Sequence, residues 1–299
     1  MNRKSWKLEL PFHLMLLPGL VLVVIFSYGP MAGIVIAFQN FNPGMGLFGS
    51  DWNGWDNFRY IYGLPETFNV IRNTVYIAVM KIIAGLIAPI ITALLLNELR
   101  KQLFKRTIQT LIYLPNFLSW VILSGILLEI LSPTTGIVNA FMAWLGLEKV
   151  FFLGNPNWFP YVMVATDVWK EFGFNTIVYL AALTAISPTL YEAAVIDGAG
   201  RWKQTLHITL PGMLPIIILL TTLSLGQVLN AGFDQIFNMY SPPVYETGDI
   251  LDTYVYRIGL GNGQFGVATA VGLFKSVISL FLMSISYFLA YRLANYRIF

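Results

Sequence analysis

Six long, continuous apolar stretches dominate the chain, and no regular alternation of apolar and polar residues interrupts them. A bilayer core about 30 Å thick needs about 20 apolar helical residues to cross it. The predicted spans cover residues 11–38, 69–96, 107–131, 158–186, 211–233 and 264–291. Membrane β-barrels need alternating strands of about 10 residues, so this class is excluded. The pattern predicts an all-α polytopic membrane protein with six transmembrane helices.

The composition excludes other classes. Of the 299 residues, 57% are hydrophobic and only 11% are charged, whereas ordinary globular domains carry roughly 25% charged residues. There is no cysteine, and the two histidines, His13 and His207, are too few for a histidine metal site. Disulfides, thiolate metal sites and cysteine nucleophiles are therefore excluded. We predict no catalytic residue, no metal site and no nucleic-acid partner.

Positive charge is distributed unevenly among the predicted loops. Lysine and arginine gather before the first stretch, after the second and fourth stretches, and in the C-terminal tail. Because these residues mark the cytoplasmic side of short loops, both termini are predicted to be cytoplasmic. The opposite loops are acidic and aromatic. We expect residues 1–10 to form a cytoplasmic N-terminus, followed by a single transmembrane domain over residues 11–299.

The cytoplasmic loop over residues 187–210 contains signals for a short helix. Thr189 and Glu192 have the spacing of a capping box. Alternatively, Ser187 is the N-cap and Pro188 the first helical residue. Gly198 supplies a stop. Such a helix, with exposed apolar residues, fits a groove on another protein, although an interfacial helix resting on lipid headgroups is an open alternative.

The same loop carries a recognisable order of residues. It contains Glu192, Ala193, Ala194, Gly198, Ile208, Leu210 and Pro211. This order resembles the EAA signature of ABC importer permeases, and the run over residues 192–199 is similar to their carbohydrate-uptake branch. Segments 226–235, 245–247 and 252–257 resemble a narrower subgroup, the LplB- and YteP-type oligosaccharide permeases. The resemblance implies a type I ABC importer permease fold in the plasma membrane of a Gram-positive bacterium.

The resemblance also implies partners. Such permeases work with a second homologous permease subunit, two ATPase subunits and an extracellular solute-binding protein, and they carry a sugar, here an oligosaccharide from complex polysaccharides. The coupling element toward the ATPase would comprise Glu192, Ala193, Ala194, Asp197, Gly198 and Ala199. The acidic and aromatic stretch from Tyr245 to Arg257 is the candidate contact for the binding protein, and a self-packed loop is the alternative.

The sequence shows no nucleotide site of its own. The Walker A pattern G-x-x-x-x-G-K-[ST] is absent. Residues 261–266 match G-x-G-x-x-G, but no acidic residue occurs after Asp252, as a dinucleotide site would require. We therefore expect no cofactor on this chain, with ATP and Mg²⁺ bound by the partner ATPase subunits.

Five charged residues lie at mid-depth within the predicted spans: Lys81, Asp167, Lys170, Glu171 and Lys275. Charged residues inside a membrane are costly and are candidates for function. Asp167, Lys170 and Glu171 share one helix face, and Lys81 and Lys275 are plausible partners for the two acids. These residues form either an internal ion-pair network or part of a substrate path. Three lysines against two acids would suit an anionic substrate, unless the charges are paired.

A sugar path needs hydrogen-bonding groups together with aromatic rings. The candidates are Gln227, Asn230 and Asp234, expected along one face of the fifth span, with Trp169, Asn175, Tyr179, Asn73 and Tyr76. Polar side chains also hold membrane helices together, so packing is the competing interpretation.

Three other function classes compete with an importer. An ion-gradient-driven secondary transporter often shows paired repeats or discontinuous helices, which are not evident here. A channel would need a selectivity filter such as TVGYG. A membrane enzyme would need a nucleophile–base or metal constellation, and the sequence contains no convincing one.

Overall fold

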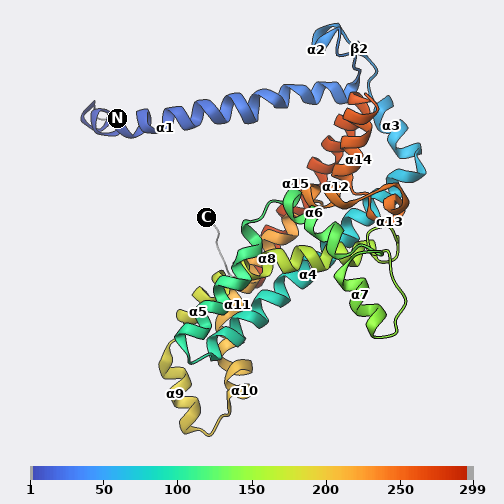
Figure 1. The fold of residues 1–299 in the computed structure, drawn as a ribbon. Helices are drawn as coiled ribbons and strands as arrows, with labels where there is room; N and C mark the ends of the chain where they lie inside the picture. The colour runs from blue at the N-terminus through green and yellow to red at the C-terminus, as the bar shows by residue number, and fades with distance from the viewer. Residues whose placement is uncertain (1–2, 295–299) are drawn as a thin grey trace. The chain divides into compact units, whose positions relative to one another are not determined.

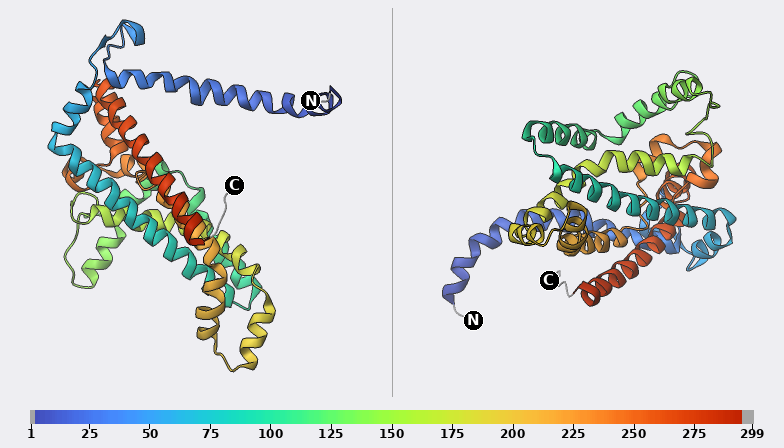
Figure 2. Two further views of the ribbon diagram at one scale, coloured as in Figure 1. Left: turned by 180° about the vertical axis from the view of Figure 1, so that it is seen from behind. Right: turned by 90° about the horizontal axis from the view of Figure 1, so that it is seen from below.

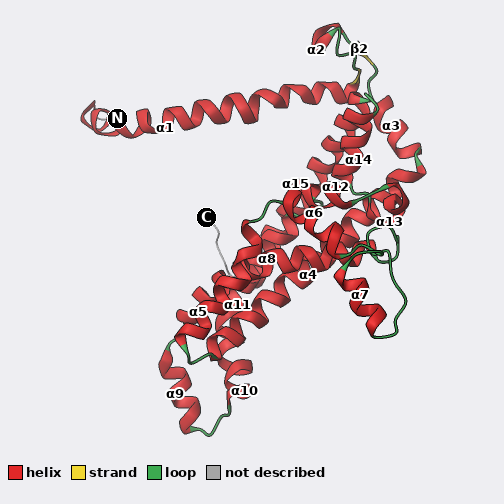
Figure 3. Cartoon of the chain, in the orientation of Figure 1, coloured by secondary structure: helices red, strands yellow, loops and turns green. Residues whose placement is uncertain are grey.

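The computed structural model describes residues 3–294, and the chain is helical almost throughout (Figure 3). The outermost residues of the predicted cytoplasmic termini, 1–2 and 295–299, lie outside the described residues. The chain forms two compact units. Unit 1 contains residues 1–64 and 255–274, and unit 2 contains residues 65–254 and 275–299. A single transmembrane domain over residues 11–299 stays a prediction.

Unit 1 combines a long apolar helix with a small aromatic cluster. Helix α1 (Arg3–Val23) continues through a π turn (Val24–Tyr28) and a 3-10 segment (Gly29–Phe38). Strands β1 (Gln39–Asn40) and β2 (Asp51–Trp52) pair antiparallel and flank α2 (Gly46–Gly49), and α3 (Asp56–Gly63) follows. Phe38 stacks on Trp52 at a centroid distance of 5.6 Å. The buried Asn57 amide donates to the carbonyls of Ala37 and Gln39, at 2.9 and 3.0 Å.

Unit 2 is built around α4 (Pro65–Glu98), α8 (Phe159–Thr184) and α11 (Leu210–Gly226). Helices α4 and α8 run side by side in Figures 1 and 2. Their apolar core includes Ile77, Phe159 and Met163, each at most 1% exposed. A glycine allows a close approach, because a Cβ at Gly173 of α8 would lie 1.9 Å from the Ile112 carbonyl oxygen. Small residues have this role in many membrane-helix contacts.

The remaining helices are mostly short. They are α5 (Gln102–Tyr113), α6 (Trp120–Ile130), α7 (Ile137–Trp144), α9 (Pro188–Ile196), α10 (Arg201–Gln204), α12 (Phe233–Met239), α13 (Tyr245–Gly248), α14 (Leu251–Tyr256) and α15 (Phe265–Ala294). Short 3-10 segments cover Leu114–Phe117 and Pro242–Val244, and π turns cover Thr205–Thr209 and Arg257–Gly261.

Among the described residues, four helices are long and apolar enough to cross a membrane, or up to six if each of two bent helix pairs is one span. The four are Glu9–Phe38, Pro65–Glu98, Arg201–Gly226 and Phe265–Leu289, and they overlap the first, second, fifth and sixth predicted spans. The fourth predicted span corresponds to α8, which is followed by α9 after a bend of 68°.

The third predicted span is not one straight helix. The segment Gln102–Phe117 meets Trp120–Ile130 at 104°. Pro115 lacks the backbone N–H that would continue a helical ladder. Ser119 then caps the new helix by accepting from the Ile122 N–H at 3.3 Å, as N-cap serines do. The stretch over residues 107–131 therefore forms two helices, and whether the pair crosses the membrane as one span stays a prediction.

The fifth predicted span also ends early. Helix α11 stops at Gly226, and residues 227–232 form a turn before α12. Gly232 has φ +95°, a backbone conformation that glycine adopts without steric cost. The prediction that Gln227, Asn230 and Asp234 lie along one face of a single helix is wrong, because the chain leaves the helix between them.

Candidate functional site

A cavity of about 600 Å³ lies within unit 2, between α4, α8, α11 and the 227–232 turn. Its polar lining consists of Lys81, Asp167, Glu171, Asn175, Tyr179, Ser224, Gln227 and Asn230. Its apolar lining consists of Ala78, Ile82, Gly85, Leu86, Val168, Leu220, Leu223, Ala231, Gly232 and Met283. Ligand pockets commonly place a few polar groups on apolar walls in this way. Carboxylates, amides and a phenol can together accept from and donate to a ligand rich in hydroxyl groups.

Lys81 closes one part of this cavity. Its side chain is 9% exposed. Its Nζ donates to the Asp167 carboxylate at 3.0 Å, to the Ala231 carbonyl at 2.8 Å and to the Gln235 side-chain oxygen. Gln235 in turn donates to the Met163 carbonyl and to Thr166, both at 2.8 Å. One ammonium therefore joins α4 to α8, to the turn and to α12, and all three of its donors are used.

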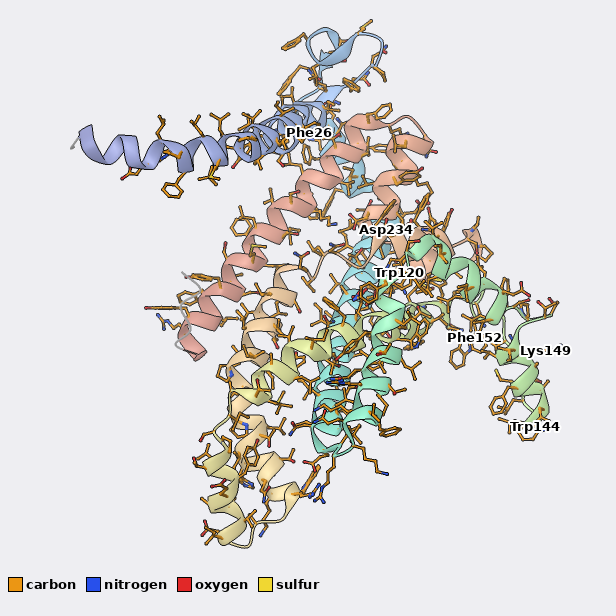
Figure 4. The ribbon with its side chains drawn as sticks, turned by 60° about the vertical axis from the view of Figure 1, so that its left-hand side comes forward. Phe26, Trp120, Trp144, Lys149, Phe152 and Asp234 are labelled. Carbon is orange, nitrogen blue, oxygen red and sulfur yellow. The ribbon has the colours of Figure 1, made fainter. Side chains whose placement is uncertain are left out.

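The second cavity carboxylate is also neutralised by a buried lysine. Glu171 accepts from Lys170 Nζ at 2.8 Å. Lys170 Nζ also donates to the Asn116 carbonyl at 3.1 Å and lies 5.5 Å from the centre of the Trp120 ring. Trp120, at the start of α6, is labelled in Figure 4. Such a position over an aromatic face is favourable for a cation.

Lys275 has a different partner from the one expected. It forms an ion pair with Asp252 and not with Asp167 or Glu171. The predicted pairing of Lys81 with Asp167 is confirmed, whereas the pairing of Lys275 with either of those acids is wrong. Each of the three intramembrane lysines thus has its own acid, so the excess of positive charge that would suit an anionic substrate is not present.

Tyr179 differs from the other polar groups of the cavity. It is 1% exposed, and its hydroxyl makes no hydrogen bond with any residue in the described part of the chain. It lies in an apolar cluster with Ala93, Leu183 and Met213. A buried hydroxyl without a partner is costly, and this one has almost no accessible surface.

A second feature is the exposed helix α9, which follows α8. Ser187 is the N-cap and Pro188 the first helical residue, so the alternative helix start is confirmed. The capping box is wrong, because Ser187 shares a hydrogen bond with Thr189 at 2.8 Å and no side chain caps the helix. Gly198, with φ +72°, ends the segment. Val195 and Ile196 are 64% and 86% exposed.

The loop that follows α9 is braced against two other helices. The Tyr191 and Thr209 hydroxyls lie 3.0 Å apart. Arg201 forms an ion pair with Glu98, the last residue of α4. The Gln204 amide donates to the Ala199 carbonyl at 2.8 Å. These contacts connect the α9 loop to α4 and to the start of α11.

Comparisons with known proteins agree with these features. Residues 85–295 match the family described as the binding-protein-dependent transport system inner membrane component. The polygalacturonan/rhamnogalacturonan transport system permease protein YteP of Bacillus subtilis (strain 168) is 42% identical, over 92% of this chain and 85% of the relative. Protein LplB of the same organism is 41% identical, over 95% and 87%.

A solved structure gives the same result for the fold. It is a bacterial ABC transporter involved in the import of the acidic polysaccharide alginate. The TM-score is 0.90 at 38% identity, covering 97% of this chain and 98% of that one. The chain belongs to this family of importer permeases. The resemblance inferred from the EAA loop is therefore confirmed.

The family decides between the competing functions. The permease is a multi-pass membrane subunit of an ABC importer, and neither a secondary transporter nor an enzyme. The short helix α9 is the segment that carries the EAA residues of this permease.

Only some of the residues predicted for the sugar path line the same cavity. Asn175, Tyr179, Gln227 and Asn230 line the cavity of the permease, together with Lys81, Asp167 and Glu171. Lys170 and Lys275 do not line it.

Four other predicted path residues lie elsewhere. Trp169 is 46% exposed on α8 and is absent from the cavity lining. Asp234 is exposed on the first turn of α12, where Figure 4 labels it. The Asn73 amide donates to the Glu246 carbonyl at 2.8 Å, and the Tyr76 hydroxyl donates to Tyr161 at 3.1 Å. These four residues do not line the cavity, and their place on a substrate path stays a prediction.

Sequence reasoning missed two polar residues. Ser224 lines the cavity three residues before Gln227, and this spacing could have identified it. Gln235 is fully buried and binds Lys81. No spacing in the sequence indicates that contact, because it joins residues 154 positions apart.

The stretch from Tyr245 to Arg257 is largely buried. Asp249, Ile250, Leu251, Thr253 and Tyr254 are each at most 1% exposed. This burial favours the self-packed alternative for most of the stretch. Glu246 and Tyr256 stay exposed and are the members that a partner could contact.

Proposed function

We propose that this permease forms half of the translocation pathway of an importer for oligosaccharides from complex polysaccharides. The observation that carries the proposal is the 600 Å³ cavity, whose amides, carboxylates and phenol lie on apolar walls between α4, α8 and α11. The relatives YteP and LplB and the alginate importer support a carbohydrate. Sugar hydroxyls would exchange hydrogen bonds with Asn175, Gln227 and Asn230.

The cavity itself does not select for an acidic sugar. Lys81 and Lys170 neutralise Asp167 and Glu171, so this half of the path is close to neutral. An acidic oligosaccharide would need its counter-charge from another subunit.

The importer would be a complex of several chains. We propose a second homologous permease, two ATPase subunits that bind ATP and Mg²⁺, and a solute-binding protein, in the plasma membrane of a Gram-positive bacterium. A solved alginate transporter has been crystallised with its pentasaccharide-bound periplasmic protein. With six spans and cytoplasmic termini, α9 would face the cytoplasm.

Helix α9 would be the coupling element. Glu192, Ala193 and Ala194 lie on the exposed helix, and Asp197, Gly198 and Ala199 form its end. The absence of bulk at the alanines and the exposed Val195 and Ile196 suit a groove on an ATPase. ATP-driven movement would then reach α4 and α11 through the braces described above.

The cavity can be tested by uptake. We expect Asn230→Ala to reduce uptake of labelled oligosaccharide by cells, with normal assembly of the complex, because a polar contact to the substrate is lost. Losing one such contact costs about 1 kcal/mol, or roughly fivefold. Asn238→Ala is the matched control, since Asn238 lies on α12 outside the cavity lining.

The substrate class is tested with the same cells. A strain without the gene should fail to grow on the transported oligosaccharide and should grow normally on a monosaccharide. Unchanged growth on every oligosaccharide tested, or purification of the permease without any ATPase, would contradict the proposed function.

A further inference from the structure

A second pocket in unit 2, of about 330 Å³, lies away from the cavity, near the first residues of α4 and α8. It is lined by Arg72, Asn73, Tyr76, Pro156, Asn157, Pro160, Tyr161 and Thr247. Internal hydrogen bonds fix its walls. Asn73 is bonded to the Glu246 and Asp249 carbonyls, and Thr247 donates to the Pro156 carbonyl at 2.6 Å. The Tyr76 and Tyr161 hydroxyls are bonded to each other.

Arg72 is the one cation among these lining residues. Its side chain is exposed, and its guanidinium forms no hydrogen bond or ion pair with any residue that the structure describes. In contrast, Lys81, Lys170 and Lys275 each have an acid. The five donors of a guanidinium suit a phosphate or a carboxylate. The pocket therefore provides a free anion-binding group in a lining that also contains two tyrosines.

This group does not face the sugar cavity along α4. Arg72 and Lys81 are nine residues apart, and at about 100° per residue they lie on opposite faces of the helix. An oblique row of exposed aliphatic side chains starts on the Arg72 face and winds round α4, because each step of four residues turns about 40°. These are Val79, Ile83, Ile87, Ile91 and Leu95, which are 37%, 53%, 52%, 51% and 65% exposed.

The length of this row matches a membrane. Tyr76 and Leu95 are nineteen residues apart, which is about 28 Å at 1.5 Å per residue. The hydrocarbon core of a bilayer is about 30 Å thick. Arg72 lies one helical turn beyond Tyr76, at the depth of the headgroups, where tyrosines are also enriched.

The composition of the row indicates lipid and not another helix. Helix–helix contacts in membranes are enriched in glycine, alanine, serine and threonine, which allow backbones to approach. The row contains only valine, isoleucine and leucine. Such branched side chains present a continuous apolar surface to acyl chains.

We propose that the pocket around Arg72 binds the headgroup of an anionic phospholipid, whose acyl chain lies along the Val79–Leu95 row. Arg72 contacts the phosphate, and the two tyrosines and Asn157 surround the rest of the headgroup. The net negative charge of the lipid is favoured because no acidic residue lines the pocket. The proposal needs only that α4 spans the membrane, so its failure would leave the transport function untouched.

Lipid retention tests the proposal directly. The assembled importer is purified in detergent, incubated with phosphatidylglycerol or phosphatidylcholine, and examined by native mass spectrometry. We expect phosphatidylglycerol to be retained over phosphatidylcholine, and Arg72→Gln to reduce that retention about fivefold, the contribution of one basic residue near anionic lipid. Arg72→Lys should retain an intermediate amount. Arg59→Gln is the control and should behave as wild type, since Arg59 is an exposed arginine already paired with Asp56.

Three results would overturn the proposal. The first is equal phosphatidylglycerol retention by wild type and Arg72→Gln. The second is displacement of the lipid by inorganic phosphate alone at millimolar concentration, which would indicate a site for free anions. The third is efficient cross-linking of an Ile87→Cys variant to the second permease in the assembled importer, which would place a protein subunit on the row.

Discussion

At the scale of single residues, the permease keeps each buried ammonium with a carboxylate. Lys81 is the clearest example, because Asp167, Ala231 and Gln235 occupy all its donors at the edge of the cavity. A mid-membrane charge is costly by itself, and here pairing offsets that cost. Asp167 is one-quarter exposed, so the pair combines a structural contact with a surface that the substrate can reach.

The first prediction concerns this pair. Lys81→Met should destabilise the permease by about 3–5 kcal/mol, since removing one partner of a buried ion pair leaves an uncompensated charge. The double variant Lys81→Met/Asp167→Asn should recover part of the loss, because no charge then remains unpaired. Thermal unfolding of the purified importer, followed with a dye or by loss of monodispersity, measures both effects.

The control for this prediction is the exposed pair of Arg59 and Asp56, whose side chains are 80% and 66% exposed. Arg59→Gln should change stability by less than about 1 kcal/mol. If Lys81→Met were as stable as Arg59→Gln, the Lys81 network would not hold the cavity edge together.

At the scale of elements, the spans are interrupted where the hydropathy pattern is continuous. A hydrophobic window does not register the missing N–H of Pro115 or the cap at Ser119, so the 104° bend was not predicted. Both residues were present in the sequence, and their order would have indicated a break. The stop at Gly226 is similar, since the residues after it remain apolar enough to look like a helix.

The short helix α9 was predictable for the opposite reason. Its start and stop depend on local chemistry, with Pro188 at the beginning and the left-handed Gly198 after the end. The cavity was only half predictable. Asn175 and Tyr179 follow from helical spacing along α8, whereas Lys81 reaches the 227–232 turn through a contact that spacing along one helix cannot indicate.

The second prediction concerns the braces of the α9 loop. Arg201→Glu places two acids together at the end of α4 and should loosen the link between α9 and that helix. We expect oligosaccharide uptake per ATP hydrolysed to fall about two- to fivefold, since an exposed pair contributes at most about 1 kcal/mol. Proteoliposomes that report uptake and ATP hydrolysis together provide the measurement.

A variant with the two charges swapped is the control for the Arg201–Glu98 ion pair. Glu98→Arg combined with Arg201→Glu should restore coupling, because the attraction is regained with reversed signs. Lys203→Glu, on the same short helix α10, should leave the ratio unchanged, because Lys203 forms no ion pair with any residue that the structure describes. An equal loss in Lys203→Glu would show that general negative charge on the loop, and not the link to α4, is responsible.

At the scale of the whole molecule, the distribution of charge and the helical structure predict different numbers of membrane spans. Basic loops predict six spans with both termini in the cytoplasm. The described helices by themselves give four spans, or up to six when each bent pair crosses the membrane. The two counts differ in part at the pair α5 and α6, because a 104° bend fits either a broken span or a re-entrant segment.

The third prediction decides between these topologies and uses the absence of cysteine from the chain, which makes every introduced thiol unique. Leu103 lies at the start of the bent pair and Trp144 lies beyond its end, and the two are 82% and 77% exposed. If α5 and α6 cross the membrane as one broken span, intact cells treated with an impermeant maleimide should label Trp144→Cys and leave Leu103→Cys unlabelled until the cells are opened. Phe48→Cys and Trp202→Cys, 104% and 79% exposed, are the reference positions expected outside and inside. A re-entrant pair would instead give Leu103→Cys and Trp144→Cys the same labelling, and the side on which they agreed would show how the remaining spans are oriented.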